Sequence, residues 1–214
     1  MNFSDINTVS DAVEFYNSNT DEKEKLLATI KSAIDENAPV DSKDELNSGT
    51  LIQNHNYANA LMLTQVMFER TTKELRILCG SDVIKFLHIL KGSFVEACKK
   101  IITNNGFVKI ISVLTENKSN ASDFTSFINE IHEISDLRDL NIETISAYLA
   151  PGKEINHFIV SDDQNLRLEE PHPIIREDSG ADSIKADVYF NNIKRASVAI
   201  RRFDDLFTYL KNNG

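Results

Sequence analysis

The sequence has little cysteine and proline and no tryptophan. Its 214 residues include two cysteines, four prolines and seven glycines. Cys79 and Cys98 are isolated from each other and from any histidine at ligand spacing. Neither a disulfide framework nor a zinc site is therefore indicated, and both thiols are expected in the core. No run approaches the roughly 20 apolar residues that span a bilayer, and residues 1–5 lack the charged and apolar regions of a signal peptide. We expect a cytoplasmic protein with no membrane partner.

Basic residues are the minority, since 33 acidic residues face 23 lysines and arginines and give a net charge of −10. A general nucleic-acid-coating protein needs a basic surface, so this function is disfavoured. Residues 1–49 hold eleven acidic residues against four lysines and so carry −7 of that charge. This acidic region is either a solvated helical face or a docking surface for a basic partner. A protein partner or self-association is therefore expected, and nucleic acid stays an open alternative.

The chain is expected to divide near residue 48. Apolar residues recur at helical spacing between residues 10 and 36 and are interrupted by the polar residues 17–20, which predicts two short helices. Proline, glycine and short polar residues between 38 and 49 favour a loop. We expect a helical N-terminal region over residues 1–48 and a second domain over 49–214 whose folding does not depend on the first.

Strands and helices alternate in the second domain. Residues 50–70 contain no proline or glycine and carry a broad apolar face, which predicts one long helix. The later pattern predicts helices at 93–103, 122–137 and 192–211, and strands at 74–80, 108–114, 142–149 and 187–190, with a hairpin at 157–168. Such alternation is typical of right-handed crossovers. The expected fold is α/β, with a mixed, largely parallel sheet flanked by helices.

The hairpin is the most informative segment, because it places a histidine at the head of an apolar strand. His157 begins the first strand, Asp162 and Asp163 form the turn, and the second strand carries Arg167 and Glu169. An imidazole with a cation and carboxylates nearby suits nucleophilic catalysis. The alternatives are a histidine that only hydrogen-bonds a neighbouring carboxylate or carbonyl, and one that binds a ligand without turnover.

The order of strands and helices over about residues 70–211 resembles one repeat of the phospholipase D-like fold. One strand in that order begins with histidine, as in this family. Active members of that family have His-x-Lys, four residues and Asp, followed by a Gly-Ser-x-Asn turn. His157 matches the histidine, but Ile159 stands at the lysine position and Gln164 at the aspartate position. Residues 167–169 stand where the Gly-Ser-x-Asn turn would be. The motif is therefore degenerate.

The resemblance implies a histidine nucleophile that attacks phosphorus beside a cation, and Ile159 cannot supply that charge. Arg167 would replace the lysine if it shares a face with His157, while Glu169 or Asp162 would orient the ring. The family mechanism uses two histidines, and a symmetric homodimer would supply the second.

We therefore expect a non-catalytic phospholipase D-like binding or regulatory module in a larger assembly, with an accessory role in a prokaryotic defence or nucleic-acid-processing system. The alternative is a metal-independent nuclease or phosphodiesterase that acts as a homodimer through His157.

A basic cluster on the last expected helix is a second candidate site. Its side chains would contact phosphate or an acidic partner surface, unless they are simply solvated or paired with nearby aspartates. The cluster consists of Lys194, Arg195, Arg201 and Arg202, and the aspartates are Asp204 and Asp205.

A metal site in the loop after the hairpin is also considered. His172 follows Glu169 and Glu170 closely and precedes Asp178. Scattered acidic and histidine residues are common in loops, however, and the spacing matches no specific metal motif. No metal and no cofactor are therefore expected.

Overall fold

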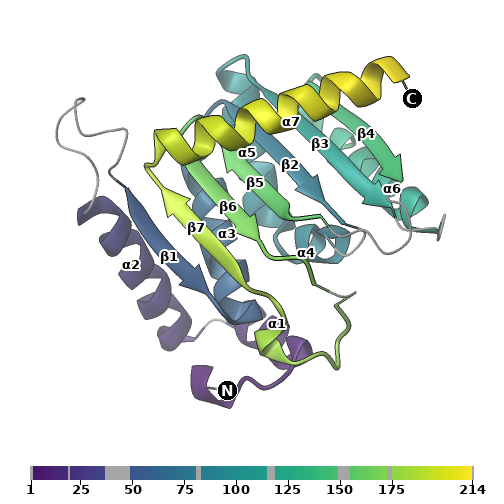
Figure 1. The fold of residues 1–214 in the computed structure, drawn as a ribbon. Coiled ribbons are helices and arrows are strands. Elements are labelled where there is room, and N and C mark those ends of the chain that lie inside the picture. Colours follow the sequence, from purple (N-terminus) through teal and green to yellow (C-terminus); the bar gives the residue numbers. More distant parts are fainter. Residues whose placement is uncertain are drawn as a thin grey trace.

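The computed structural model describes residues 2–18, 20–36, 49–80, 83–114, 119–148, 155–172 and 175–213 (Figure 1). Its helices are α1 (Val9–Asn17), α2 (Asp21–Glu36), α3 (Tyr57–Arg70), α4 (Val83–Ile89), α5 (Lys91–Thr103), α6 (Ser119–His132) and α7 (Ile193–Asn213). Its strands are β1 (Thr50–Asn54), β2 (Glu74–Cys79), β3 (Phe107–Leu114), β4 (Ile142–Tyr148), β5 (His157–Ser161), β6 (Asn165–Glu169) and β7 (Ala186–Phe190). Short 3-10 helices cover Phe3–Asp5, Ser135–Leu137 and Ala181–Ser183.

The strands form one mixed sheet in the order β1-β7-β6-β5-β2-β3-β4. β2, β3 and β4 are parallel, because α4 and α5 return the chain from β2 to β3 and α6 returns it from β3 to β4. The strands β5, β6, β7 and β1 join this half through antiparallel pairs. The α/β class and the mixed sheet are confirmed. The parallel part is smaller than expected, since β5 returns as β6 through a tight turn and β6 pairs antiparallel with β7.

The prediction of one helix over residues 50–70 is wrong in its first part. Residues Thr50–Asn54 form β1, which pairs antiparallel with β7, and the helix starts only at Tyr57. The side chain of Asn56 accepts a hydrogen bond from the Ala58 amide and so caps α3. Asn56, between the two elements, therefore marks the start of the helix more strongly than the absence of proline and glycine suggested.

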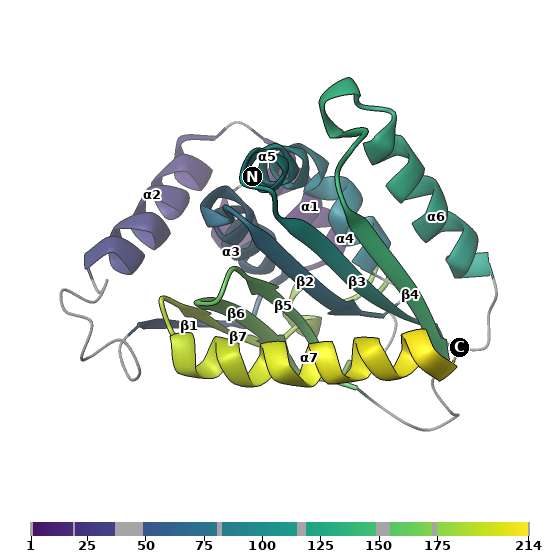
Figure 2. The same ribbon diagram turned by 90° about the horizontal axis from the view of Figure 1, so that it is seen from above.

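The sheet lies between two unequal helical layers. In Figure 2, α7 crosses one face, while α1 to α6 lie on the other side. Side chains along β5 alternate accordingly: Phe158 and Val160 pack in the cluster under α7, and Ile159 packs in the larger cluster opposite. In the described part of the chain, no helix is long and apolar enough to cross a membrane.

The two N-terminal helices are present as expected, and both pack on the main core. Phe15 of α1 and Ile34 of α2 are fully buried in the same cluster as α3 and β2. Backbone amides of Val9 and Ser10 donate hydrogen bonds to carbonyl groups of residues 179 and 177 near the other end of the chain. The loop expected to separate the domains, residues 37–48, lies outside the described residues. The division at residue 48 thus stays a prediction.

Candidate functional site

The candidate site lies where β2 ends and β5 begins. In the β5–β6 pair, His157 is opposite Glu169 and Ile159 is opposite Arg167. Side chains of directly opposite residues share a face of the sheet, and so do residues two apart on one strand. The register therefore places His157, Arg167 and Glu169 together on the face that carries α1 to α6. The condition that the sequence left open, a shared face for His157 and Arg167, is thus met.

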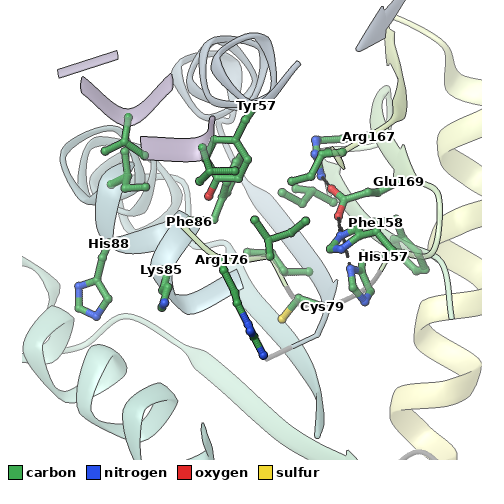
Figure 3. Close-up of a pocket in the computed structure, with 18 of the residues that line it drawn as sticks. Tyr57, Cys79, Lys85, Phe86, His88, His157, Phe158, Arg167, Glu169 and Arg176 are labelled. Atoms are coloured by element: carbon green, nitrogen blue, oxygen red, sulfur yellow. Dashed lines mark hydrogen bonds and ion pairs between the residues drawn. The ribbon is translucent and has the colours of Figure 1, made fainter. Parts of the chain in front are cut away.

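Glu169 is the centre of this group. His157 Nδ1 lies 3.4 Å from Glu169 Oε1, and His172 Nε2 contacts the same oxygen. Arg167 Nη1 forms an ion pair with Glu169 Oε2. Figure 3 shows Glu169 between Arg167 and the His157 ring. The His157 and His172 rings are nearly perpendicular, with their centroids 5.2 Å apart. Both oxygens of one buried carboxylate are thus engaged by three nitrogen-bearing side chains.

The protonation state of Glu169 follows from these contacts. Burial would raise the pKa of its carboxyl group, but the charge of Arg167 and the hydrogen bonds from His157 and His172 outweigh burial and hold the pKa far below its usual range. Glu169 is therefore ionised at neutral pH, and the Arg167–Glu169 pair carries no net charge.

Gly80, directly after β2, makes room for the histidine. A methyl group at this position would lie 2.9 Å from both Cε1 and Nε2 of His157, closer than real side-chain contacts allow. Only glycine therefore leaves the ring in its present place. The sequence pattern predicted Gly80 as the end of a strand and contained no sign of this contact.

These side chains line a cavity of about 580 Å³ between the sheet and the helical layer. Figure 3 shows Tyr57 and Phe86 across the cavity from His157. The wall also includes the basic residues Lys85 and Arg176. Cys79 lines the cavity as well, and burial, aided by the charge of Glu169, raises the pKa of its thiol. Cys98 is buried elsewhere, as expected, and burial raises the pKa of its thiol to about 12.

Arg167 is the most unusual group in the cavity wall. Only 4% of its side chain is exposed, and its Cζ lies 5.5 Å from the centre of the Phe86 ring. One guanidinium nitrogen pairs with Glu169, whereas Nε and Nη2 find no acceptor among the residues that the structure describes. A buried guanidinium with two unused donors is rare, because each unsatisfied group costs about 1–3 kcal/mol.

Asp162 is not part of this group. It follows Ser161 at the opposite end of β5, roughly 16 Å along the strand from His157. Its carboxylate accepts hydrogen bonds from the amides of Thr72, Lys73 and Glu74 and from the Thr72 hydroxyl. This aspartate therefore attaches the hairpin turn to the start of β2, and it does not orient the His157 ring.

The basic cluster of α7 lies on the other side of the sheet from the cavity. Its four side chains, Lys194, Arg195, Arg201 and Arg202, are exposed. Asp204 pairs with Arg76 of β2 instead of with the cluster. The Arg195 guanidinium lies over the Tyr189 ring, 5.4 Å from its centre. The cluster and the His157 group cannot contact one small ligand together.

Sequence reasoning placed His172 near Glu169 but did not include it in the site. The structure brings His172 into contact with Glu169 and places it beside His157. The only sequence signal of this contact is that His172 follows the second strand of the hairpin by a few residues. Lys85, Phe86 and Arg176 were also missed. They reach the cavity from α4 and from the segment after β6, and no motif connects these positions in the sequence.

Comparison with known proteins shows likeness in fold only. No protein-family profile and no curated protein sequence matches the chain. Among solved structures, TrmBL2, an archaeal chromatin protein that binds DNA, is 15% identical over 87% of this chain with a TM-score of 0.49. This chain covers 60% of the length of the TrmBL2 chain.

Two further solved structures also resemble the chain. Nuc from Salmonella typhimurium, a phospholipase D family member, is 15% identical, with a TM-score of 0.47, over 75% of this chain and 95% of its own. NucT from Helicobacter pylori is 11% identical, with a TM-score of 0.45, over the same shares. The chain is thus similar to phospholipase D-like structures in its α/β fold.

Proposed function

We propose that this protein is a non-catalytic phospholipase D-like binding or regulatory module, and that its cavity holds an anionic group such as a phosphate. The observation that supports this proposal is the buried Arg167, whose Nε and Nη2 have no acceptor in the described part of the chain while its side chain lines a cavity. Both nitrogens are shielded from solvent in the structure, so the Arg167 side chain would have to turn towards the cavity to reach a ligand there. A phosphate or carboxylate, which offers several oxygens at the spacing of a guanidinium fork, would then satisfy both donors.

The charge of the cavity wall also favours an anion. The whole chain carries −10, yet the wall combines Arg167 with Lys85 and Arg176 against only Glu169 and Glu177. Glu169 is already neutralised by Arg167. Low-dielectric walls strengthen the field of the remaining cations within a cavity. An anionic ligand would therefore be attracted to this cavity.

Catalytic turnover of a phosphodiester is disfavoured by the surroundings of Ile159 and Arg167. Ile159, at the position of the family's lysine, is 3% exposed and packs in the core. Arg167 shares the face of His157, but its charge is balanced by the ionised Glu169. A phosphoryl transition state needs a cation whose charge is not already compensated. Arg167 is thus suited to hold an anion by hydrogen bonds and poorly suited to stabilise the charge that develops during phosphoryl transfer.

Ligand binding tests the proposal. Isothermal titration calorimetry in EDTA with inorganic phosphate, sulfate and a mononucleotide should show saturable binding of at least one of them to the unmodified chain. The double variant Arg167→Met/Glu169→Gln removes both partners of the ion pair, which avoids leaving a buried charge unpaired. It should remain folded and lose this binding.

The matched control for that variant is Arg76→Met. Arg76 is also a buried arginine in ion pairs, but it faces α7 and pairs with Glu74 and Asp204. Arg76→Met should therefore keep the anion affinity. Absence of binding for all three probes, or undiminished binding by the folded double variant, would contradict the proposal.

A second candidate is metal-independent phosphodiester hydrolysis, and one observation favours it. The sequence resemblance implied a second histidine, for which a symmetric homodimer was one source, yet His172 lies beside His157 within one chain. Hydrolysis of bis-nitrophenyl phosphate, single-stranded DNA or RNA in EDTA should not exceed that of His157→Ala if the binding function is correct. EDTA-resistant activity that is abolished by His157→Ala and by Arg167→Ala would establish the enzyme instead.

The accessory role in a defence or nucleic-acid-processing assembly, and the cytoplasmic location, stay part of this proposal. The basic cluster of α7 is exposed, which supports a contact with the phosphates of a nucleic acid or with an acidic protein surface. Because the cluster lies on a different face from the cavity, such a contact would leave the cavity accessible. The module would thus present two separate binding surfaces, one on each side of the sheet.

A further inference from the structure

Three side chains at the cavity wall have the composition of a metal site. One ligand atom each from His157, Glu169 and His172 can be chosen so that all lie within 4.8 Å of one another. Ligand atoms about 2.0–2.2 Å from a tetrahedral Zn²⁺ are roughly 3.4 Å apart. The His157 Nδ1–Glu169 Oε1 distance is 3.4 Å, and His172 Nε2, now in contact with that oxygen, would have to move away slightly.

We infer that His157, Glu169 and His172 form a site for one divalent transition-metal ion, with Zn²⁺ the best-matched ion, and that its open coordination position faces the cavity. Two imidazoles and one carboxylate suit zinc-class ions, whereas Mg²⁺ and Ca²⁺ prefer oxygen ligands. Three protein ligands leave a fourth position for water or an anion.

The surroundings support the three ligands. The His157 and Glu169 side chains project from paired strands, so their separation is set by the register of the sheet. Arg167 holds Glu169 Oε2 and leaves Oε1 directed at the histidines. Such outer contacts orient metal-binding carboxylates. Gly80 leaves space for the His157 ring, which a larger residue would push away.

Metal binding does not depend on the proposed anion site and is measured separately. The protein is stripped with EDTA, freed of the chelator and titrated with Zn²⁺ alone against a chromogenic competitor, without phosphate. The expected result is one Zn²⁺ per chain. His157→Gln and His172→Gln should each weaken binding by about 100-fold or more, because even outer-shell partners are worth about 10- to 100-fold.

His88→Gln is the matched control, since His88 lines the same cavity but lies outside the cluster. It should bind Zn²⁺ as the unmodified chain does. Circular dichroism and thermal melting without metal confirm that each variant is folded. Lack of stoichiometric binding by the unmodified chain, or unchanged affinity in the folded His157→Gln and His172→Gln variants, would overturn the site.

Binding of Co²⁺ tests which side chains are the metal ligands. Co²⁺ in the same protein should give visible absorption of a four-coordinate ion without the near-ultraviolet band of a thiolate ligand. A thiolate band that disappears in Cys79→Ser would show that the neighbouring cysteine is a ligand, and it would contradict the assignment of three ligands. Failure of Zn²⁺ binding with retained phosphate binding in EDTA would remove the metal site and leave the proposed function intact.

Discussion

At the scale of single residues, the candidate site depends on how closely Gly80 and His157 approach. A β-carbon at residue 80 would lie 2.9 Å from two ring atoms of His157. The ring must move if a methyl group is added, and its contact with Glu169 would change. The position thus limits the conformation of the histidine although it contributes no chemical group of its own.

We expect Gly80→Ala to lower the free energy of unfolding by about 1–3 kcal/mol, the usual range for overpacking, and to shift the imidazole NMR signals of His157. Gly92→Ala is the control, because a β-carbon there meets no atom within 4 Å and alanine favours the helix α5. It should be neutral or stabilising. Combining Gly80→Ala with His157→Ala should recover part of the loss, and a loss of the same size without the ring would show that the clash is not the cause.

At the scale of elements, the hairpin is where the sequence was most informative. An apolar run that turns at an acidic pair predicted the two strands, and period two places Arg167 and Glu169 on one face of β6. Whether His157 shares that face depends on the register across the turn, which the sequence left as a condition and the structure fixes. β1 was misread, since five residues before a helix carry too little pattern to separate a strand from a helical turn. His172 contacts Glu169 from only three residues away. Its place beside His157 and the contact of Phe86 with Arg167 depend on packing between distant segments, which no local pattern encodes.

The turn of the β5–β6 hairpin is attached to the start of β2 by Asp162. Asp162 has a φ of 53° and accepts four hydrogen bonds from residues 72–74. We expect Asp162→Ala to lower the free energy of unfolding by about 3 kcal/mol, because it loses charge-assisted hydrogen bonds and leaves alanine in a left-handed conformation.

Urea denaturation measures this loss. Asp163→Ala is the matched control, since Asp163 is the exposed neighbour in the same turn, and it should change the stability by less than about 0.5 kcal/mol. Folded Asp162→Ala should bind anions as the unmodified chain does. Loss of anion binding in that folded variant would return Asp162 to the site.

At the scale of the whole molecule, one core joins segments from both ends of the chain. α1 and α2 bury Phe15 and Ile34 against the helical face of the sheet, although the charge pattern indicated a separate acidic region. An exposed acidic face and a buried apolar face belong to the same helices. Net charge therefore described the surface of this region and contained no information about its packing.

Phe15→Ala tests whether the chain unfolds as one unit. Removing a fully buried ring from a shared core should lower the free energy of unfolding by about 3–5 kcal/mol while keeping a single transition in urea followed by circular dichroism. Tyr209→Ala, at an aromatic residue that is 64% exposed, should have little effect. Two separate transitions, with only the first affected by Phe15→Ala, would instead support the domain boundary at residue 48.

The attachment of α1 has a consequence for regulation. Val9 and Ser10 donate backbone hydrogen bonds to residues 179 and 177, and their side chains also line the cavity. An occupant that binds the cavity more tightly when α1 is docked would be thermodynamically linked to the docking of this helix, and such linkage is reciprocal. A partner that captured the acidic N-terminal segment and drew α1 away would then weaken the binding of that occupant. An occupant of the cavity would, by the same free energy, keep that partner from binding.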